Sequence, residues 1–138
     1  MSTRAQIGFY DTDDHKISGW DALVYKHSDG YPEGVLPLLQ DFCRMFNKNR
    51  GLSDSEYAAA RYVTALCNQR EKDLMEWRKE SPHAFPKGDK PDLLGVGISK
   101  DFHGDIEYFY AVSPHRIAVY SVSGAPSDEA VPEKVIEL

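Results

Sequence analysis

The sequence feature that most constrains the fold is the stretch at residues 25–34, which reads YKHSDGYPEG. Asp29 can bond the backbone two residues further on, and Gly30 can adopt positive φ without a steric penalty. Tyr31 precedes a proline, which pushes it toward extended geometry. We therefore expect a strand to end here, the chain to turn sharply and a helix to begin. The same stretch brings together an imidazole, a carboxylate and two phenols, so it is the first place to look for a functional site.

Alternation of apolar and polar residues predicts five strands, two before a helical region and three after it. The first two should pair antiparallel, as a hairpin with a long polar connection. The last three are joined by turns and should form a meander. The predicted strands are residues 5–10, 22–27, 93–99, 106–112 and 116–122.

Between these two groups of strands, apolar side chains recur at helical spacing in two segments. The first helix is predicted at residues 35–50, and Pro37 places its start near Leu36 because proline is tolerated in a first turn. The second helix has a clear start signal, since Ser53 is followed three residues later by Glu56 and the pair forms a capping box. The short link between the helices predicts an antiparallel helical hairpin.

The predicted fold class is therefore α+β, with the element order ββααβββ and a five-stranded antiparallel sheet that carries the helical hairpin on one face. A chain of 138 residues fits one domain and buries enough surface to fold without a disulfide or a metal. We predict a single domain at residues 1–123. Prolines and acidic charges follow it, so residues 124–138 are predicted to be a loosely ordered acidic tail.

Composition points to a cytoplasmic protein. No apolar run approaches the ~20 residues that a membrane span needs, and the first residues lack the apolar core of a signal peptide. Cys43 and Cys67 both fall in helical patterns, where they are expected to be buried thiols of a reducing compartment.

The formal net charge is -6. Nucleic-acid binding depends on neutralising phosphates with Lys and Arg, so we do not expect direct nucleic-acid binding. A negative charge fits simple solubility, and it also fits an acidic surface that meets a basic partner.

A local pattern occurs twice, as His27-Ser28-Asp29 and as His103-Gly104-Asp105, each at the end of a predicted strand. If the two turns lie at one edge of the sheet, two imidazoles and two carboxylates would converge, and His115 could join them in a metal site that activates a water. The alternative is that His and Asp are common turn and surface residues. No spacing matches a known metal motif, so we expect no metal and no cofactor. In the alternative of a metal site, the candidate ligands are His27, Asp29, His103 and Asp105.

Tyrosines are the other candidate binding feature. Tyr108, Tyr110 and Tyr120 lie on adjacent strands of the predicted meander, and Tyr25 can join them in an aromatic recognition platform. The alternative is that Tyr108 and Tyr110 form a layer beneath the helices, and we favour the core for two of these tyrosines. The candidate binding residues are Tyr25, His27, Asp29, Tyr31, Tyr108, Tyr110 and Tyr120.

Nucleophilic catalysis has no supporting motif. The chain contains no Gly-x-Ser-x-Gly elbow, and its two cysteines lie on apolar helix faces rather than in the open, electropositive setting of a reactive thiolate. We therefore expect a binding protein rather than an enzyme.

Residues 24–37, which read VYKHSDGYPEGVLP, are similar to a segment in small uncharacterised proteins of phages, prophages and bacteria. In that group a helical middle is also followed by a Gly-rich strand and a DIEYxY strand, here residues 105–110. The resemblance covers most of residues 22–122 and leaves out the early acidic loop and the tail. It implies a viral or mobile-element context, with the host cytoplasm as the location, and carries over no catalytic residue.

Three functions are compatible with these features. We favour a small acidic protein that binds a partner protein, such as a phage-encoded, anti-CRISPR-like inhibitor of a host defence or nucleic-acid-handling protein. The first alternative is a small metal-dependent hydrolase or nuclease that uses the two His-x-Asp turns. The second is a self-associating structural protein, for example a homodimer, that pairs through the strand at residues 95–97 or through the tail.

Overall fold

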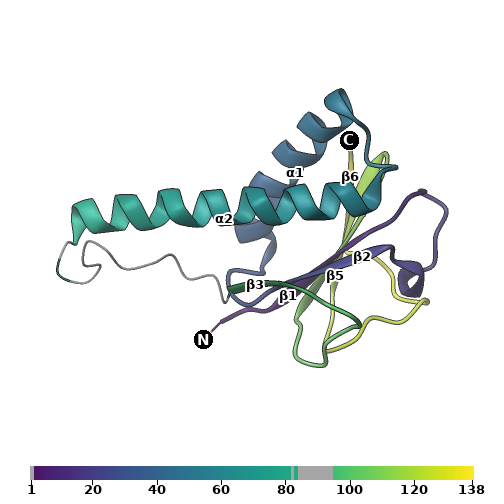
Figure 1. Cartoon of the computed structure of the whole chain (residues 1–138). Helices are drawn as coiled ribbons and strands as arrows, with labels where there is room; N and C mark the ends of the chain where they lie inside the picture. The colour runs from purple at the N-terminus through teal and green to yellow at the C-terminus, as the bar shows by residue number, and fades with distance from the viewer. Residues whose placement is uncertain (1, 82, 84–94) are drawn as a thin grey trace.

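A computed structural model describes residues 2–81, 83 and 95–138 of the chain and shows an α+β fold. Two α-helices lie on one side of a six-stranded sheet, and the C-terminal half of the second helix extends past the sheet (Figure 1). The elements are β1 (Ala5–Phe9), the 3-10 helix η1 (Ile17–Gly19), β2 (Ala22–Lys26), α1 (Pro32–Asn49), α2 (Ser55–Glu80), β3 (Val96–Ile98), β4 (Tyr108–Ser113), β5 (Arg116–Ser121) and β6 (Lys134–Glu137).

The sheet has the order β3-β2-β1-β4-β5-β6 and is mixed rather than antiparallel. β1 and β2 form the predicted antiparallel hairpin, but β1 and β4 run parallel, with Ile7 opposite Tyr110. The prediction of an antiparallel five-stranded sheet is therefore wrong in strand number and in one pairing. Parallel neighbours need a long crossover, and the helices with the segment after them provide it.

The predicted meander of the last three strands is confirmed for β4 and β5, which pair antiparallel, and is wrong for β3. β3 pairs antiparallel with β2, Ile98 lying opposite Val24, and it forms one edge of the sheet. The chain then crosses to the middle of the sheet, where β4 pairs with β1 and with β5. Residues 93 and 94 of the predicted strand lie outside the described residues.

Both faces of the sheet are covered. Because β1 is central, all five of its residues are buried, and its side chains alternate between a core under the helices and a second core under loops. The second core is closed by Ile17 of η1 and by loop residues that include Trp20, Phe102 and Ile106. The sheet residues of the helix-side core are Ala5, Ile7, Phe9, Val24, Tyr110, Val112, Ile117 and Val119.

α1 begins at Pro32, several residues before the predicted start. Pro32 suits the first helical position because its missing N–H has no partner there in any case. Pro37 consequently lies inside the helix, on an exposed surface where water can reach the carbonyl that it leaves unbonded. Neither helix of the described residues combines the length and apolar character needed to cross a bilayer.

α2 begins at Ser55, so the predicted capping box of Ser53 and Glu56 does not form. Asp54 occupies the N-cap position without a side-chain cap and pairs instead with Arg50. A residue outside α2 stabilises the start of the helix instead. The carboxylate of Asp11, just after β1, accepts a hydrogen bond from the Ser55 hydroxyl and lies 3.4 Å from the Ser55 backbone nitrogen.

The C-terminal segment differs from the predicted loose tail, because residues 134–137 form β6 at the second edge of the sheet. β6 pairs antiparallel with β5, and Ile136 lies opposite the buried Ile117. Ile136 and Leu138 pack against the helix-side core. Apolar contacts with the sheet thus order this segment, although its own acidic composition does not predict a strand.

Candidate functional site

The end of β2 sends neighbouring side chains to opposite faces of the sheet. Lys26 lies opposite Ala5 of the helix-side core, whereas Tyr25 packs against the core under the loops. Successive residues of a strand alternate in this way, so the reactive side chains of residues 25–34 cannot share one pocket. They contribute instead to two places, a pocket on the helix side and an exposed patch on the loop side.

The turn after β2 is fixed by its neighbours in the sheet. The Gly30 N–H donates to the Thr3 carbonyl at 2.9 Å, and the buried Tyr110 hydroxyl donates to the Gly30 carbonyl at 2.6 Å. A Cβ on Gly30 would lie 2.7 Å from the Cβ of Ala5, so only glycine allows this approach. The turn is therefore tied to the segment just before β1 and to β4 before α1 begins.

Asp29 adopts a positive φ of 54°, a conformation that no other non-glycine residue of the described chain adopts. Its carbonyl lies against α1, because a Cβ on Gly34 would be 2.5 Å from the Asp29 oxygen. Aspartate tolerates the left-handed region better than most residues, but the conformation still carries strain. Such strain persists where the surroundings fix it, and it is often found at functional positions.

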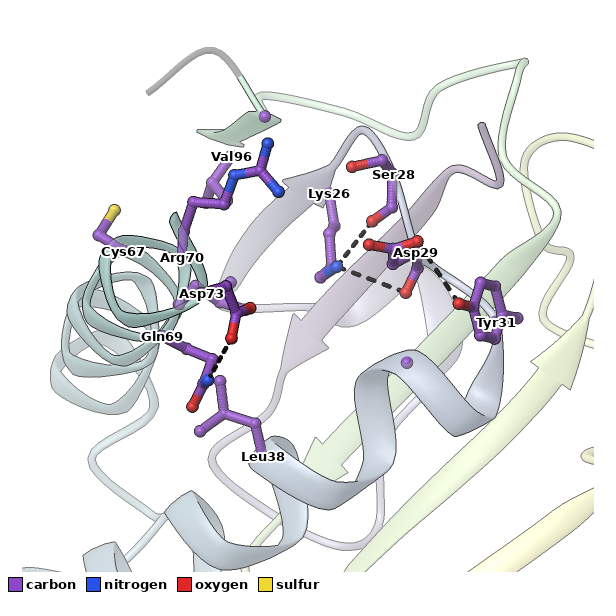
Figure 2. A pocket seen from close by; sticks show the side chains of 13 residues that line it. Lys26, Ser28, Asp29, Tyr31, Leu38, Cys67, Gln69, Arg70, Asp73 and Val96 are labelled. Carbon is purple, nitrogen blue, oxygen red and sulfur yellow. Dashed lines mark hydrogen bonds between the residues drawn. The ribbon is translucent and has the colours of Figure 1, made fainter. Parts of the chain in front are cut away.

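A pocket of about 210 Å³ opens between this turn, α1, α2 and β3 (Figure 2). Its apolar lining includes Leu38, Leu66 and Val96. At about 30 Å³ for each water molecule, the pocket holds roughly seven waters. It lies below the range of about 300–1,000 Å³ typical of drug-sized ligands, so its occupant must be small. We call it the Lys26 pocket.

Lys26 is the central cation of this pocket. Its ammonium donates to the Ser28 carbonyl at 2.6 Å and lies 3.4 Å from the Asp29 carbonyl. Burial lowers the pKa of Lys26 below its ordinary value; Asp29 opposes this effect and Arg70 adds to it. No ion pair joins Lys26 to a carboxylate within residues 2–81, 83 and 95–138. Two backbone carbonyls contact the ammonium, but no carboxylate of the described residues lies within ion-pair distance of it.

Three further charged side chains line the pocket, Asp29 from the turn and Arg70 and Asp73 from α2. The Arg70 guanidinium carbon lies 5.0 Å from the centre of the Trp77 ring, and Asp73 accepts a hydrogen bond from Gln69 at 2.9 Å. None of the three forms an ion pair in the described part of the chain. The pocket is therefore bordered by two cations and two carboxylates that do not neutralise one another by direct contact.

On the loop side, the two His-x-Asp turns meet around Tyr25. The Tyr25 hydroxyl donates to Asp105 at 3.1 Å, and the ring stacks on His103 with centroids 4.3 Å apart. Arg4 lies 3.4 Å from the same carboxylate oxygen and 3.5 Å from the Nδ1 atom of His27. Desolvation raises the pKa of Tyr25, and the hydrogen bond to Asp105 raises it further. We call these five residues the Tyr25 patch.

Gln6 positions the second turn of this patch. Its buried side chain donates to the Ser99 hydroxyl at 3.0 Å and to the Asp101 carbonyl at 3.2 Å, and it accepts from the His103 N–H at 3.0 Å. Gly97, opposite Tyr25 on β3, leaves the space above its backbone open, with no atom within 4 Å of an added Cβ.

The predicted metal candidates separate. Asp29 faces the Lys26 pocket, whereas His27, His103 and Asp105 belong to the Tyr25 patch. His115 is remote from both and bonds Asp13 instead, at 2.6 Å. Among the described residues, no group of three or more His, Cys, Asp or Glu side chains is arranged to hold a metal ion.

The tyrosines do not form one platform. Tyr110 is buried beneath the helices, and Tyr108 lies half-buried beside it, with ring centroids 6.4 Å apart. Tyr120 belongs to the opposite core, beside Phe109. Tyr31 is exposed at the Lys26 pocket. The core interpretation therefore holds for Tyr110, and the platform fails because Tyr108 and Tyr120 lie on opposite faces.

Lys26, Arg70 and Asp73 are not among the site residues predicted from the sequence. One signal was available, because Lys26 shares its strand face with Val24 and so points toward the helices. Another is that Arg70 and Asp73 follow Leu66 at intervals of four and seven residues, which places charges along the buried stripe of a helix.

Fold and pocket together define a small α+β protein with a mixed six-stranded sheet and a charged pocket beneath its helices. No model of a known protein family, no curated protein and no solved structure matches the chain. The similarity to phage and prophage proteins therefore stays a prediction.

Proposed function

We propose that this protein binds a small organic anion with a carboxylate group in the Lys26 pocket. The observation that carries this proposal is the ammonium of Lys26, which faces the pocket and has no carboxylate partner in the described chain. A largely buried charge is costly unless it is paired, so an anionic ligand would supply what the protein leaves out.

Arg70 supports the same function. It lines the pocket beside Lys26, close enough for the two positive charges to influence each other. Like charges at one pocket raise each other's energy in the empty protein, and a bound anion removes that repulsion. The aliphatic lining from Leu38 and Leu66 then suits a ligand with a short hydrocarbon part.

A titration series tests the proposal. Thermal unfolding is measured with millimolar acetate, propanoate, butanoate and 4-methylpentanoate, because a ligand of the native state must raise the melting temperature. We expect a rise that depends on the carboxylate concentration and at least a tenfold loss of affinity in Lys26→Met. The matched control is Lys72→Met, which removes an exposed lysine of α2 outside the pocket. Absence of any shift with all four acids would disprove the proposal.

A second candidate function is recognition of a partner protein by the Tyr25 patch, as an acidic inhibitor would require. The observation in favour is that this patch borders the edge strand β3, where Gly97 lies opposite Tyr25 and leaves the space above its backbone open. Tyr and Arg are the side chains that most often anchor protein interfaces, and an exposed strand edge can accept a strand from a partner.

Affinity capture from host lysate tests this second function, with Tyr25→Ala and the exposed-surface control Tyr57→Ala compared with the unchanged chain. We expect one stoichiometric partner that Tyr25→Ala loses and Tyr57→Ala keeps. Recovery of no such partner, or equal recovery by both variants, would remove this candidate.

A further inference from the structure

We infer that the ligand of the Lys26 pocket is a small zwitterion, with a carboxylate and an ammonium group on one molecule as in an α-amino acid. This inference rests on the proposed anion-binding function and adds a second ionic contact to it.

The charges around the pocket carry the inference. Lys26 and Arg70 would attract an anion, but Asp29 and Asp73 line the same space and would repel it. Neither carboxylate is neutralised by an ion pair within the described residues. A pocket for a simple anion has no use for two carboxylates without ion-pair contacts, whereas a zwitterion offers a partner to both signs and has zero net charge, like this set of four side chains.

The four charged side chains of the Lys26 pocket come from two sides of it. Arg70 and Asp73 project from one face of α2, one turn apart, while Lys26 and Asp29 come from the end of β2 and the turn after it (Figure 2). One Asp73 oxygen accepts from Gln69, and the other has no hydrogen-bond partner in the described chain, so it is open to a ligand ammonium. A carboxylate and an ammonium on one carbon could thus reach opposite charges on the two sides.

The volume and the apolar lining of the Lys26 pocket limit the rest of the ligand. A volume of about 210 Å³ leaves room for one amino acid and excludes a peptide of several residues or a whole nucleotide. Leu38, Leu66 and Val96 offer an aliphatic side chain apolar contact. These features favour an aliphatic amino acid over one with a polar side chain, since the apolar lining gives a polar side chain no hydrogen-bond partner.

The first test compares matched ligands by calorimetric titration. The common α-amino acids are screened first, and those that bind are compared with the same molecule lacking the ammonium, such as 4-methylpentanoate for leucine, and lacking the carboxylate, such as 3-methylbutylamine. We expect at least one amino acid to bind tenfold or more tightly than either partial molecule. If the deaminated acids bind as tightly as the amino acids, the zwitterion inference fails and the anion-binding function stands. If neither class binds, both fail.

The second test uses charge-removing variants. Asp73→Asn keeps an oxygen that can accept from Gln69, and Asp29→Asn keeps a residue that tolerates positive φ, so neither should disturb the fold. We expect at least one of them to reduce amino-acid affinity about tenfold while leaving the affinity for the deaminated acid the same or higher. The control Asp41→Asn, on the exposed side of α1, should change neither. Equal losses for amino acid and deaminated acid in both pocket variants would overturn the inference.

Discussion

At the scale of single residues, the turn before α1 depends on two glycines, Gly30 and Gly34, at which an added Cβ would clash with neighbouring backbone atoms. Alanine in an open helix is worth about 1 kcal/mol more than glycine, so Gly34→Ala would ordinarily stabilise α1. Here the new Cβ would lie 2.5 Å from the Asp29 carbonyl oxygen, and backbone cannot swing aside as a flexible side chain would. We expect Gly34→Ala to lower the free energy of unfolding by about 1–3 kcal/mol, measured by urea titration.

The control for this prediction is Gly97→Ala on β3. No atom lies within 4 Å of the position of its Cβ, and glycine weakens a strand interior. We expect the same measurement to show no loss, or a small gain. Equal behaviour of the two variants would mean that the turn of residues 29–34 is not packed as tightly as described.

At the scale of elements, the start of α2 is held by a residue that is distant in sequence. Ser55 is 1% exposed and finds its acceptor in Asp11, whose negative charge also suits the N-terminal end of a helix. Asp11→Ala leaves the Ser55 hydroxyl buried without this acceptor. We expect a loss of about 1–2 kcal/mol in the free energy of unfolding.

Ser53→Ala is the matched control for Asp11→Ala. The capping-box pattern predicts that Ser53 stabilises α2, but the helix begins two residues later and Ser53 is exposed. We expect this variant to unfold like the parent in urea. A larger loss for Ser53→Ala than for Asp11→Ala would restore the capping box and contradict the observed helix start.

The loop after β1 is also tied to the turn between β4 and β5, through Asp13 and His115. Burial alone would raise the pKa of Asp13, but hydrogen bonds from His115 and Ser113 outweigh it and lower the pKa to about 2, from an ordinary value of 3.8. Since the folded-state pKa is lower, this contact stabilises the fold fully above the unfolded-state value and is lost as pH falls through about 2.

We therefore expect the difference in unfolding free energy between the parent and Asp13→Asn to be largest above pH ~4 and to shrink toward pH ~2. The difference should be about 1 kcal/mol at its largest, since His115 is mostly exposed and solvent screens the pair. Urea titrations of both chains from pH 6 to pH 2 measure it. A constant difference across this range would show that the Asp13 carboxylate contributes nothing through its charge.

Elements with local signals could be predicted from the sequence, and contacts between distant segments could not. The β1–β2 hairpin and the two helices follow from periodicity over neighbouring residues. The Asp11 contact to Ser55 joins residues 44 positions apart, and no local pattern marks it. The Lys26 pocket has the same origin, because β2, the turn, α1 and α2 each contribute a wall.

At the scale of the whole molecule, the strand order decides which of these segments meet. The three β-rich segments at the end of the chain look alike in sequence, and adjacent strands usually pair with each other. β3 instead pairs with the last three residues of β2, and β4 takes the central place next to β1. This placement brings the second His-x-Asp turn against Tyr25, as the sequence analysis allowed but could not decide.

The same order makes β6 part of the structural core rather than a tail. β5 would be an edge strand without it, the completely buried Ile117 would lose its neighbour Ile136, and the helix-side core would lose the packing of Leu138. A chain ending at residue 133 should therefore lose about 2–4 kcal/mol of unfolding free energy, since it lacks two partly buried aliphatic side chains at about 1–2 kcal/mol each.

Two point variants separate packing from the mere length of the chain. Ile136→Ala removes a side chain that packs on the core, so it should cost about 1–2 kcal/mol in urea titrations, less than a fully buried position because Ile136 is only partly covered. Val135→Ala, at a side chain that is 46% exposed on the other face, should cost less than half of that.

Hydrogen exchange of the β5 amides should quicken in the truncated chain, since strand pairing protects them. A truncated chain as stable as the parent would mean that residues 134–138 contribute no packing, and the sheet would then end at β5. Such a result would leave acidic composition, rather than the pairing of Ile136 with Ile117, as the better guide to this segment.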